Sequence, residues 1–253
     1  MVGWRALAEE LDAWAGAGRA LDLWLRDDDA AEPTTALARL IDLTGEAELP
    51  LCLAVIPAAA GPALAARIAA ASEGLVAVPH GYAHHNHAPP GEKKAEFPPG
   101  RDPDAVIEEL GRAWSVTVEL FGARAMPVLV PPWNRIADAL IPRLPGAGYR
   151  GLSTITASAV APLSVAGLQR RDADVDIVDW RGSRAFVGEA AALEAIVARL
   201  VMLRGAAEAR PLGILTHHLV HDEAAWAFLA KFAARTRGHG SVRWPSLAKI
   251  FTL

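Results

Sequence analysis

The chain has 253 residues, of which 52% are hydrophobic and 21% charged, a balance typical of a globular protein with a substantial core. Its formal net charge of −4 provides no basic surface for nucleic acid or for an anionic membrane. No apolar run is long enough to cross a bilayer, and the charged amino-terminal segment lacks the apolar centre of a signal peptide, so we expect a cytoplasmic protein without a transmembrane segment.

Short apolar runs alternate with longer segments rich in alanine and leucine, whose apolar residues recur at helical spacing. Cys52 lies in an apolar run and is expected to be buried. Because it is the only cysteine, a disulfide within the chain is excluded. In chain order the pattern predicts a helix near 4–16, a strand near 21–26, a helix near 35–44, a strand near 51–56, a helix near 62–72, a strand near 75–79, a helix near 104–121, a strand near 127–131, a helix near 136–144, strands near 149–153 and 175–179, a helix near 188–204, a strand near 211–216 and a helix near 222–235.

The alternation of strands and helices predicts a single α/β domain over residues 1–253 with a parallel sheet. Several strands are apolar on both faces, as expected when helices cover them. About seven such units favour a distorted (β/α)7 barrel over the alternative, a doubly wound open sheet. The irregular segment 88–103, rich in proline and glycine, is predicted to be a flap over a site, and a solvated loop without a role is the alternative.

Seven of the eight histidines fall in two short clusters, at 80–87 and 217–221, and three adjacent carboxylates follow Arg26 at 27–29. Adjacent carboxylates repel one another unless a positive charge lies among them. All three clusters follow predicted strands, where parallel α/β folds build their active sites. His80 and His84 with one aspartate would form the donor set of a catalytic zinc-type centre with open positions for water and substrate.

The motifs, in this order, resemble those of the polysaccharide deacetylases of the NodB homology type, which are metal-dependent hydrolases of N-acetyl groups on a (β/α)7 barrel. Arg26 to Ala30 corresponds to the first motif, Thr-Phe-Asp-Asp-Gly, and His80 to His84 corresponds to the second, His-Ser/Thr-x-x-His, with glycine at the second position. Val130 to Arg135 only echoes the third motif, Arg-x-Pro-Tyr, because its arginine is missing. Asp176 to Trp180 reproduces the fourth, Asp-x-x-Asp-Trp, and Leu215 to His217 the fifth, Leu-x-His.

The resemblance implies that Asp28 is the general base and that Asp29, His80 and His84 bind the metal. A register shifted by one residue would give these two aspartate roles to Asp27 and Asp28 instead. The metal would be one divalent transition ion, zinc first, with cobalt, nickel, iron or manganese as alternatives. In the family the arginine of the third motif holds the catalytic aspartate, and Arg26 or Arg135 would have to replace it here.

The resemblance also implies that His217 is the general acid and that Asp179 lies beside it and raises its pKa. Aromatic and polar residues near these groups are expected to bind the substrate, namely Trp133, Asn134, Arg135 and Trp180. Arg181 and Arg184 would bind an anionic group of the substrate or else face water.

The function implied is hydrolysis of carbon–nitrogen bonds other than peptide bonds, as in a deacetylase of an N-acetylated sugar or a related small molecule. The alternatives are an amidohydrolase of cyclic amides or ureides, a degenerate family member that only binds carbohydrate, and a metal-free barrel that uses its histidines as acid and base. The sequence does not indicate an oligomeric state.

Overall fold

The computed structural model describes residues 2–156, 165–208 and 210–253. Its larger sheet has the strand order β3-β2-β1-β8-β7, with β9 paired to the start of β1, and every pair is parallel. β1 is the central strand and the longest one described, and its far end carries the acidic cluster. The strands are β1 (Leu21–Ala30), β2 (Leu51–Val55), β3 (Leu75–Pro79), β7 (Val175–Asp176), β8 (Leu212–Thr216) and β9 (Val242–Arg243).

A smaller parallel sheet joins the larger one at both of its edges. It contains β4 (Val128–Leu129), β5 (Gly151–Leu152) and β6 (Gln169–Arg170). Parallel bridges link His80 to Val130 on one side and Ile155 to Ala173 on the other, and the chain runs directly from β6 into β7. The predicted α/β fold is confirmed, and the ring of strands is completed by isolated bridges rather than by one continuous closed sheet.

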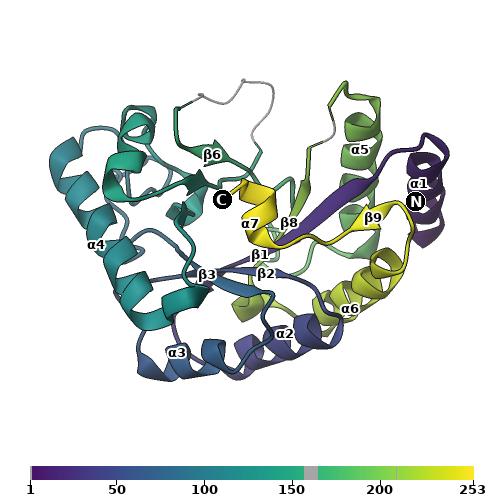
Figure 1. Ribbon diagram of the computed structural model, residues 1–253, viewed down its shortest axis with the longest axis horizontal. Coiled ribbons are helices and arrows are strands. Elements are labelled where there is room, and N and C mark those ends of the chain that lie inside the picture. Colours follow the sequence, from purple (N-terminus) through teal and green to yellow (C-terminus); the bar gives the residue numbers. More distant parts are fainter. Residues whose placement is uncertain (1, 157–164, 209) are drawn as a thin grey trace.

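Helices α1 to α6 lie on the outer side of the strands, whereas α7 lies over the middle of the ring (Figure 1). The second helix shows why: Thr34 caps its first turn by accepting a hydrogen bond from the Leu37 amide, and the residues at helical spacing after it are buried. Burying each leucine on such a face contributes roughly 1.5–3 kcal/mol. The helices are α1 (Trp4–Gly16), α2 (Thr35–Glu46), α3 (Pro62–Ala69), α4 (Pro103–Phe121), α5 (Glu189–Gly205), α6 (Glu223–Arg237) and α7 (Leu247–Phe251).

Side chains of β1 alternate between two cores. Leu23 and Leu25 pack under the helices, whereas Trp24 packs inside the ring of strands with Cys52 and Phe251 of α7. Gly213 on the neighbouring strand leaves room for the indole, because an added Cβ would lie 2.6 Å from Trp24. The same alternation sends Arg26 and Asp28 into the ring above Trp24.

The structure differs from the predicted elements at several places. The segment near 136–144 is a 3-10 helix over Asp138–Ala147 instead of an α-helix, because Pro142 and Pro145 lack the amide hydrogens that an α-helix needs. β6 and β9 were not predicted because neither lies in an apolar run, and the five residues of α7 carry too little periodicity.

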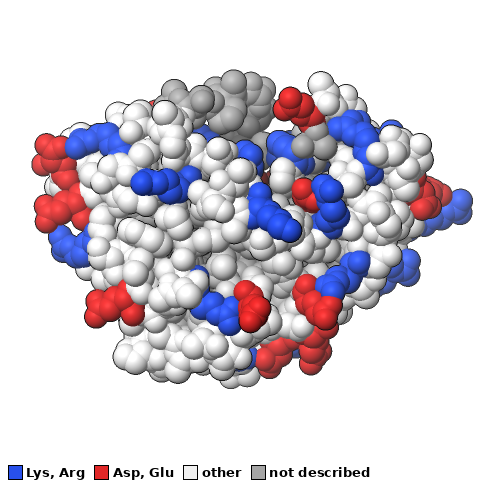
Figure 2. Space-filling view, viewed as in Figure 1, with Lys and Arg blue, Asp and Glu red and all other residues white. Residues whose placement is uncertain are grey.

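The predicted flap divides into two parts. Residues 89–94 are exposed, whereas residues 95–98 are buried and Phe97 belongs to a hydrophobic cluster with α4. Charges on the face seen in Figure 2 are interspersed, and neither sign forms a continuous patch there. No helix in the part of the chain that the structure describes is long and apolar enough to cross a membrane.

Candidate active site

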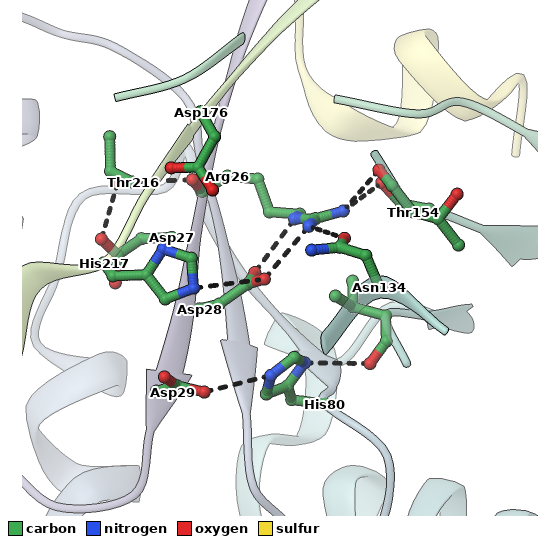
Figure 3. A network of polar contacts seen from close by, with 12 residues as sticks. Arg26, Asp27, Asp28, Asp29, His80, Asn134, Thr154, Asp176, Thr216 and His217 are labelled. Carbon is green, nitrogen blue, oxygen red and sulfur yellow. Dashed lines mark hydrogen bonds and ion pairs between the residues drawn. The ribbon is translucent and has the colours of Figure 1, made fainter. Parts of the chain in front are cut away.

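The three adjacent carboxylates of β1 reach three different surroundings. Asp27 and Asp28 point to opposite sides of the strand, as alternate residues do. The pairing register with β2 then shifts between Asp27 and Ala30, and Asp29 has a positive φ of 74°. This bend turns the Asp29 side chain away from the other two, so the carboxylates do not share one environment (Figure 3).

Asp28 forms a buried ion pair with Arg26, two residues earlier on the same face of β1. The Nε and Nη2 atoms of Arg26 lie 2.9 and 3.1 Å from the two carboxylate oxygens. The guanidinium also donates to the side chain of Ser153 at 2.7 Å and to the carbonyl of Thr154 at 3.0 Å. Of the two residues expected to replace the missing arginine of the third motif, Arg26 pairs with Asp28, whereas Arg135 donates to the carbonyl of Lys94 at 2.8 Å.

Asp29 lies between the two predicted histidine ligands. Its Oδ1 is 3.1 Å from Nε2 of His80 and 3.3 Å from Nε2 of His84. The Nδ1–H of His80 can donate to the carbonyl of Val130 at 3.0 Å, which leaves a lone pair on Nε2. The ring of His84 packs on Trp133 at a centroid distance of 4.3 Å.

These three side chains fit a metal ion. One donor atom from each lies within 4.8 Å of the others. Burial opposes a charge on His80, but the negative charges of Asp28 and Asp29 outweigh it and raise the pKa of His80. For Asp29, the hydrogen bonds and charges of the histidines outweigh burial and lower its pKa. The carboxylate therefore attracts a positive charge, which a divalent cation would supply.

Glu96 and Gly81 hold the histidine loop in place. Glu96 is buried, and its carboxylate accepts hydrogen bonds from the amides of Tyr82 at 3.2 Å and Ala83 at 2.8 Å. A Cβ at Gly81 would lie 1.8 Å from Glu96 and 2.6 Å from Pro132. The close approach of Glu96 therefore accounts for glycine at the position where the second motif has serine or threonine.

His217 faces Asp28 across the site. Its Nε2 lies 3.9 Å from Oδ2 of Asp28. The imidazole ring also makes an edge-to-face contact with the indole of Trp180, at a centroid distance of 4.7 Å. Asp176 lies close by and accepts a hydrogen bond from Nε1 of Trp180 at 2.8 Å. Burial raises the pKa of Asp176, although the charge of His217 opposes this.

Asp179 does not take the position that we expected for it. Its carboxylate accepts hydrogen bonds from the amides of Gly182 at 2.9 Å and Ser183 at 3.2 Å, and the residue does not line the cavity. β7 ends at Asp176, so the chain has already turned at Asp179. Of the two carboxylates of the fourth motif, only that of Asp176 lines the cavity with His217.

Asp27 ties β1 to the end of β8. Its carboxylate accepts from the Thr216 hydroxyl at 2.6 Å and the His218 amide at 2.9 Å, and it lies 2.5 Å from Nδ1 of His218. Asp27 and His218 are both buried. Asp27 is thus engaged on the side away from His80, and the geometry favours the register that pairs Asp29 with the histidines. The contact between Asp27 and His218 was not predicted, because only the register of β1 against β8 brings the two residues together.

The side chains of Asp28, Asp29, His80, His84, Asp176 and His217 open into one cavity of about 540 Å³. The predicted substrate-binding residues line it, and Asn134 also accepts a hydrogen bond from Arg26 at 2.5 Å. The lining comprises Asp28, Asp29, His80, His84, Lys94, Trp133, Asn134, Arg135, Ile155, Asp176, Trp180, Arg181, Arg184 and His217.

His221, the last histidine of the second cluster, packs against Trp226 at a centroid distance of 4.5 Å. Burial lowers its pKa from 6.5 to about 4. Below the ordinary pKa the unfolded chain takes up a proton that the folded protein excludes, so we expect the free energy of unfolding to fall as the pH drops from 6.5 to about 4.

Urea denaturation across this pH interval checks the effect. The His221→Gln variant lacks the titrating group and should show a shallower loss of stability than the wild type. His85→Gln, at an exposed histidine, is the control and should follow the wild type. Equal slopes for all three proteins would contradict the assignment to His221.

No known protein-family profile matches the chain, and no curated protein matches it either. Several solved structures are similar to the chain. A provisionally assigned polysaccharide deacetylase from Mycobacterium smegmatis has 18% identity, a TM-score of 0.67 and coverage of 93% of this chain and 90% of the other. A peptidoglycan N-acetylglucosamine deacetylase in complex with an N-hydroxybenzamide compound has 17% identity, a TM-score of 0.59 and coverage of 95% and 96%.

A family 4 acetyl xylan esterase from Clostridium thermocellum, in complex with a cobalt ion, has 16% identity, a TM-score of 0.54 and coverage of 91% of this chain and 90% of the other. The coverage shows that the similarity extends over nearly the whole of each chain. The chain therefore has the fold of these deacetylases and esterases, as the resemblance of its motifs predicted.

Proposed function

We propose that this chain is a divergent polysaccharide deacetylase of the NodB type, a metal-dependent hydrolase that removes an acetyl group from the amide nitrogen of a sugar or a related small molecule. The observation that carries the proposal is the convergence of two sets of groups in one cavity. Asp29, His80 and His84 form a donor set for a metal, and Asp28 and His217 face each other beside it.

Asp29, His80 and His84 would hold the ion, with Asp28 free for proton transfer. When bound, a divalent transition metal would polarise the acyl oxygen and lower the pKa of a water molecule toward neutrality. Zinc is the first candidate, and cobalt, nickel, iron and manganese suit the same donors. The structural relative that contains cobalt supports an ion of this class.

Asp28 is the general base in this proposal. Arg26 occupies one side of its carboxylate through two contacts and so fixes its orientation, while Oδ2 remains directed toward His217. Asp28 would take the proton of the attacking water as the carbon–oxygen bond forms. Since the pair is buried, this orientation is maintained without rearrangement of solvent.

His217 is the general acid that protonates the departing amine as the carbon–nitrogen bond breaks. Its Nε2 lies on the cavity side of Asp28, and Trp180 restricts the ring from the other side. Asp176 lines the same cavity and is hydrogen bonded to Trp180. An amine leaves poorly without a proton, so the acid matters more for an amide than for an acetyl ester.

Metal content and acetate release test the proposal together. We expect about one equivalent of a transition metal per chain by elemental mass spectrometry, lost in His80→Ala and in His84→Ala because each removes one of only three ligands. His85→Ala is the matched control, since His85 is the next residue in the same loop and lies outside the cavity lining. Acetate released from N-acetylated sugars should follow metal content.

Two results would overturn the proposal. Metal that persists in both ligand variants would place the ion elsewhere. A metal-loaded wild type that releases no acetate from acetamides or acetyl esters, yet binds carbohydrate, would instead support a binding protein without turnover.

A further inference from the structure

Four positively charged side chains line the cavity without an ion-pair partner. Lys94 and Arg135 come from the segments after the histidine loop and β4, and Arg181 and Arg184 follow β7. None of them has a carboxylate within ion-pair distance among the residues that the structure describes. The remaining residues, 1, 157–164 and 209, include no aspartate or glutamate in the sequence. The guanidinium of Arg135 donates one hydrogen bond to the carbonyl of Lys94 at 2.8 Å, and within the described parts of the chain none of the four charges is neutralised by a carboxylate.

What distinguishes the four cations is their place around one cavity. The protein has a net charge of −4, and several arginines elsewhere pair with carboxylates, as Arg39 does with Glu223 and Arg67 with Asp42. Other cations that form no ion pair among the described residues, such as Arg235, lie apart from the cavity. Four positive charges around one cavity are expected to attract an anion into it.

The three carboxylates that line the cavity have other partners, since Asp176 accepts hydrogen bonds from the Val178 amide and the Trp180 indole. Asp28 is neutralised by Arg26, and Asp29 lies between His80 and His84. Lys94 instead lies 6.0 Å from the centroid of the Trp133 ring, at the outer part of the site.

Asp179 stabilises the turn that carries two of the cations, Arg181 and Arg184. Its carboxylate accepts from the amides of Arg181 and Gly182, and its carbonyl accepts from the Arg184 amide at 2.8 Å. The turn therefore fixes the backbone at both arginines beside the cavity. Guanidinium groups bind phosphate and carboxylate through paired hydrogen bonds, which makes two arginines that line the same cavity suitable for such a group.

We propose that the substrate carries an anionic group, a phosphate or a carboxylate, next to its acylated nitrogen, and that Lys94, Arg135, Arg181 and Arg184 bind this group. This inference rests on the proposed deacetylase function and narrows its substrate class. Asp179 then acts as a positioning residue for the two arginines rather than as a partner of His217.

Matched probes test the proposal with the metal-loaded protein. N-acetylglucosamine 6-phosphate and N-acetylmuramic acid carry a phosphate and a carboxylate, and N-acetylglucosamine is the neutral reference. We expect kcat/KM for at least one anionic probe to exceed the neutral value by about tenfold or more, as paired hydrogen bonds to a charged group would give. The preferred probe identifies the anion.

Arginine variants decide whether the preference comes from this site. In Arg181→Gln and Arg184→Gln the ratio of anionic to neutral kcat/KM should fall severalfold, and Arg181→Lys should give an intermediate ratio. Arg235→Gln removes the same charge from the exposed surface of α6 and should keep the wild-type ratio. A ratio near one in the wild type, or one unaffected by both variants, would overturn the proposal.

A binding measurement separates this proposal from the deacetylase function. Calorimetric titration of Asp28→Asn with the same three probes needs no turnover. Tighter binding of an anionic probe, weakened by Arg181→Gln in the same background, would support the anion site even if no probe were hydrolysed. Equal binding of all three probes would overturn it, whatever the activity of the wild type.

Discussion

We expect the Asp28→Asn variant to lose about 10²- to 10⁴-fold in kcat, the usual contribution of a general base, while it keeps its metal. Asparagine has nearly the same shape as aspartate but cannot accept the proton of the attacking water. Since Asp29, His80 and His84 are unchanged, the metal donor set remains complete. Acetate release and elemental mass spectrometry on the same preparation measure the two quantities.

Asp22→Asn is the matched control for this result. Asp22 lies on the same strand, β1, at its opposite end, and pairs with Arg243 outside the cavity. It should retain wild-type turnover. If Asp28→Asn also retained it, Asp28 would not be the base, and the hydrolytic mechanism proposed here would fail.

Replacing Arg26 by methionine should lower the free energy of unfolding by about 3–5 kcal/mol, because it leaves the carboxylate of Asp28 buried without its partner. Both side chains of this pair are at most 1% exposed, and the guanidinium also satisfies Ser153 and Thr154. Urea denaturation with linear extrapolation measures the loss. We also expect the surviving folded protein to turn over slowly, since Asp28 loses its fixed orientation.

Two further variants make this second result specific. Arg26→Met combined with Asp28→Leu removes both charges and should recover part of the lost stability, which keeps the test informative if the single variant fails to fold. Arg243→Met breaks the exposed pair with Asp22 on the same strand and should cost no more than about 1 kcal/mol. A similarly small loss in Arg26→Met would show that the buried pair does not hold Asp28.

Much of the fold follows from local pattern. The spacing of Leu37, Leu40, Ile41 and Thr44 marks one buried face of α2, and the apolar run at 51–55 is a fully buried strand. β6 and β9 were not predicted because they lie in no apolar run and are defined only by their pairing with β5 and β1. Hydrophobic periodicity carries no information about which strands pair.

The sequence likewise predicted part of the candidate site and missed another part. The histidine spacing and the order of the motifs placed Asp28, His80, His84 and His217 around one cavity, and the structure brings them together there. Asp176 was missed as the neighbour of His217 because the sequence does not say at which residue β7 ends. Its spacing of four residues from Trp180, to which it is hydrogen bonded, is a signal that could have found it.

The sequence by itself determined the alternation of strands and helices, the clusters at the strand ends and the donor types available for a metal, because these depend on residue type and spacing along the chain. Only the tertiary structure decided which of three adjacent aspartates meets which partner. The bend at Asp29, the buried Arg26 beside Asp28 and the contact of Asp27 with His218 all depend on strand register and on the direction of side chains. Residues 127 or more apart in the chain, such as Arg26 and Ser153, meet only after the strands have assembled.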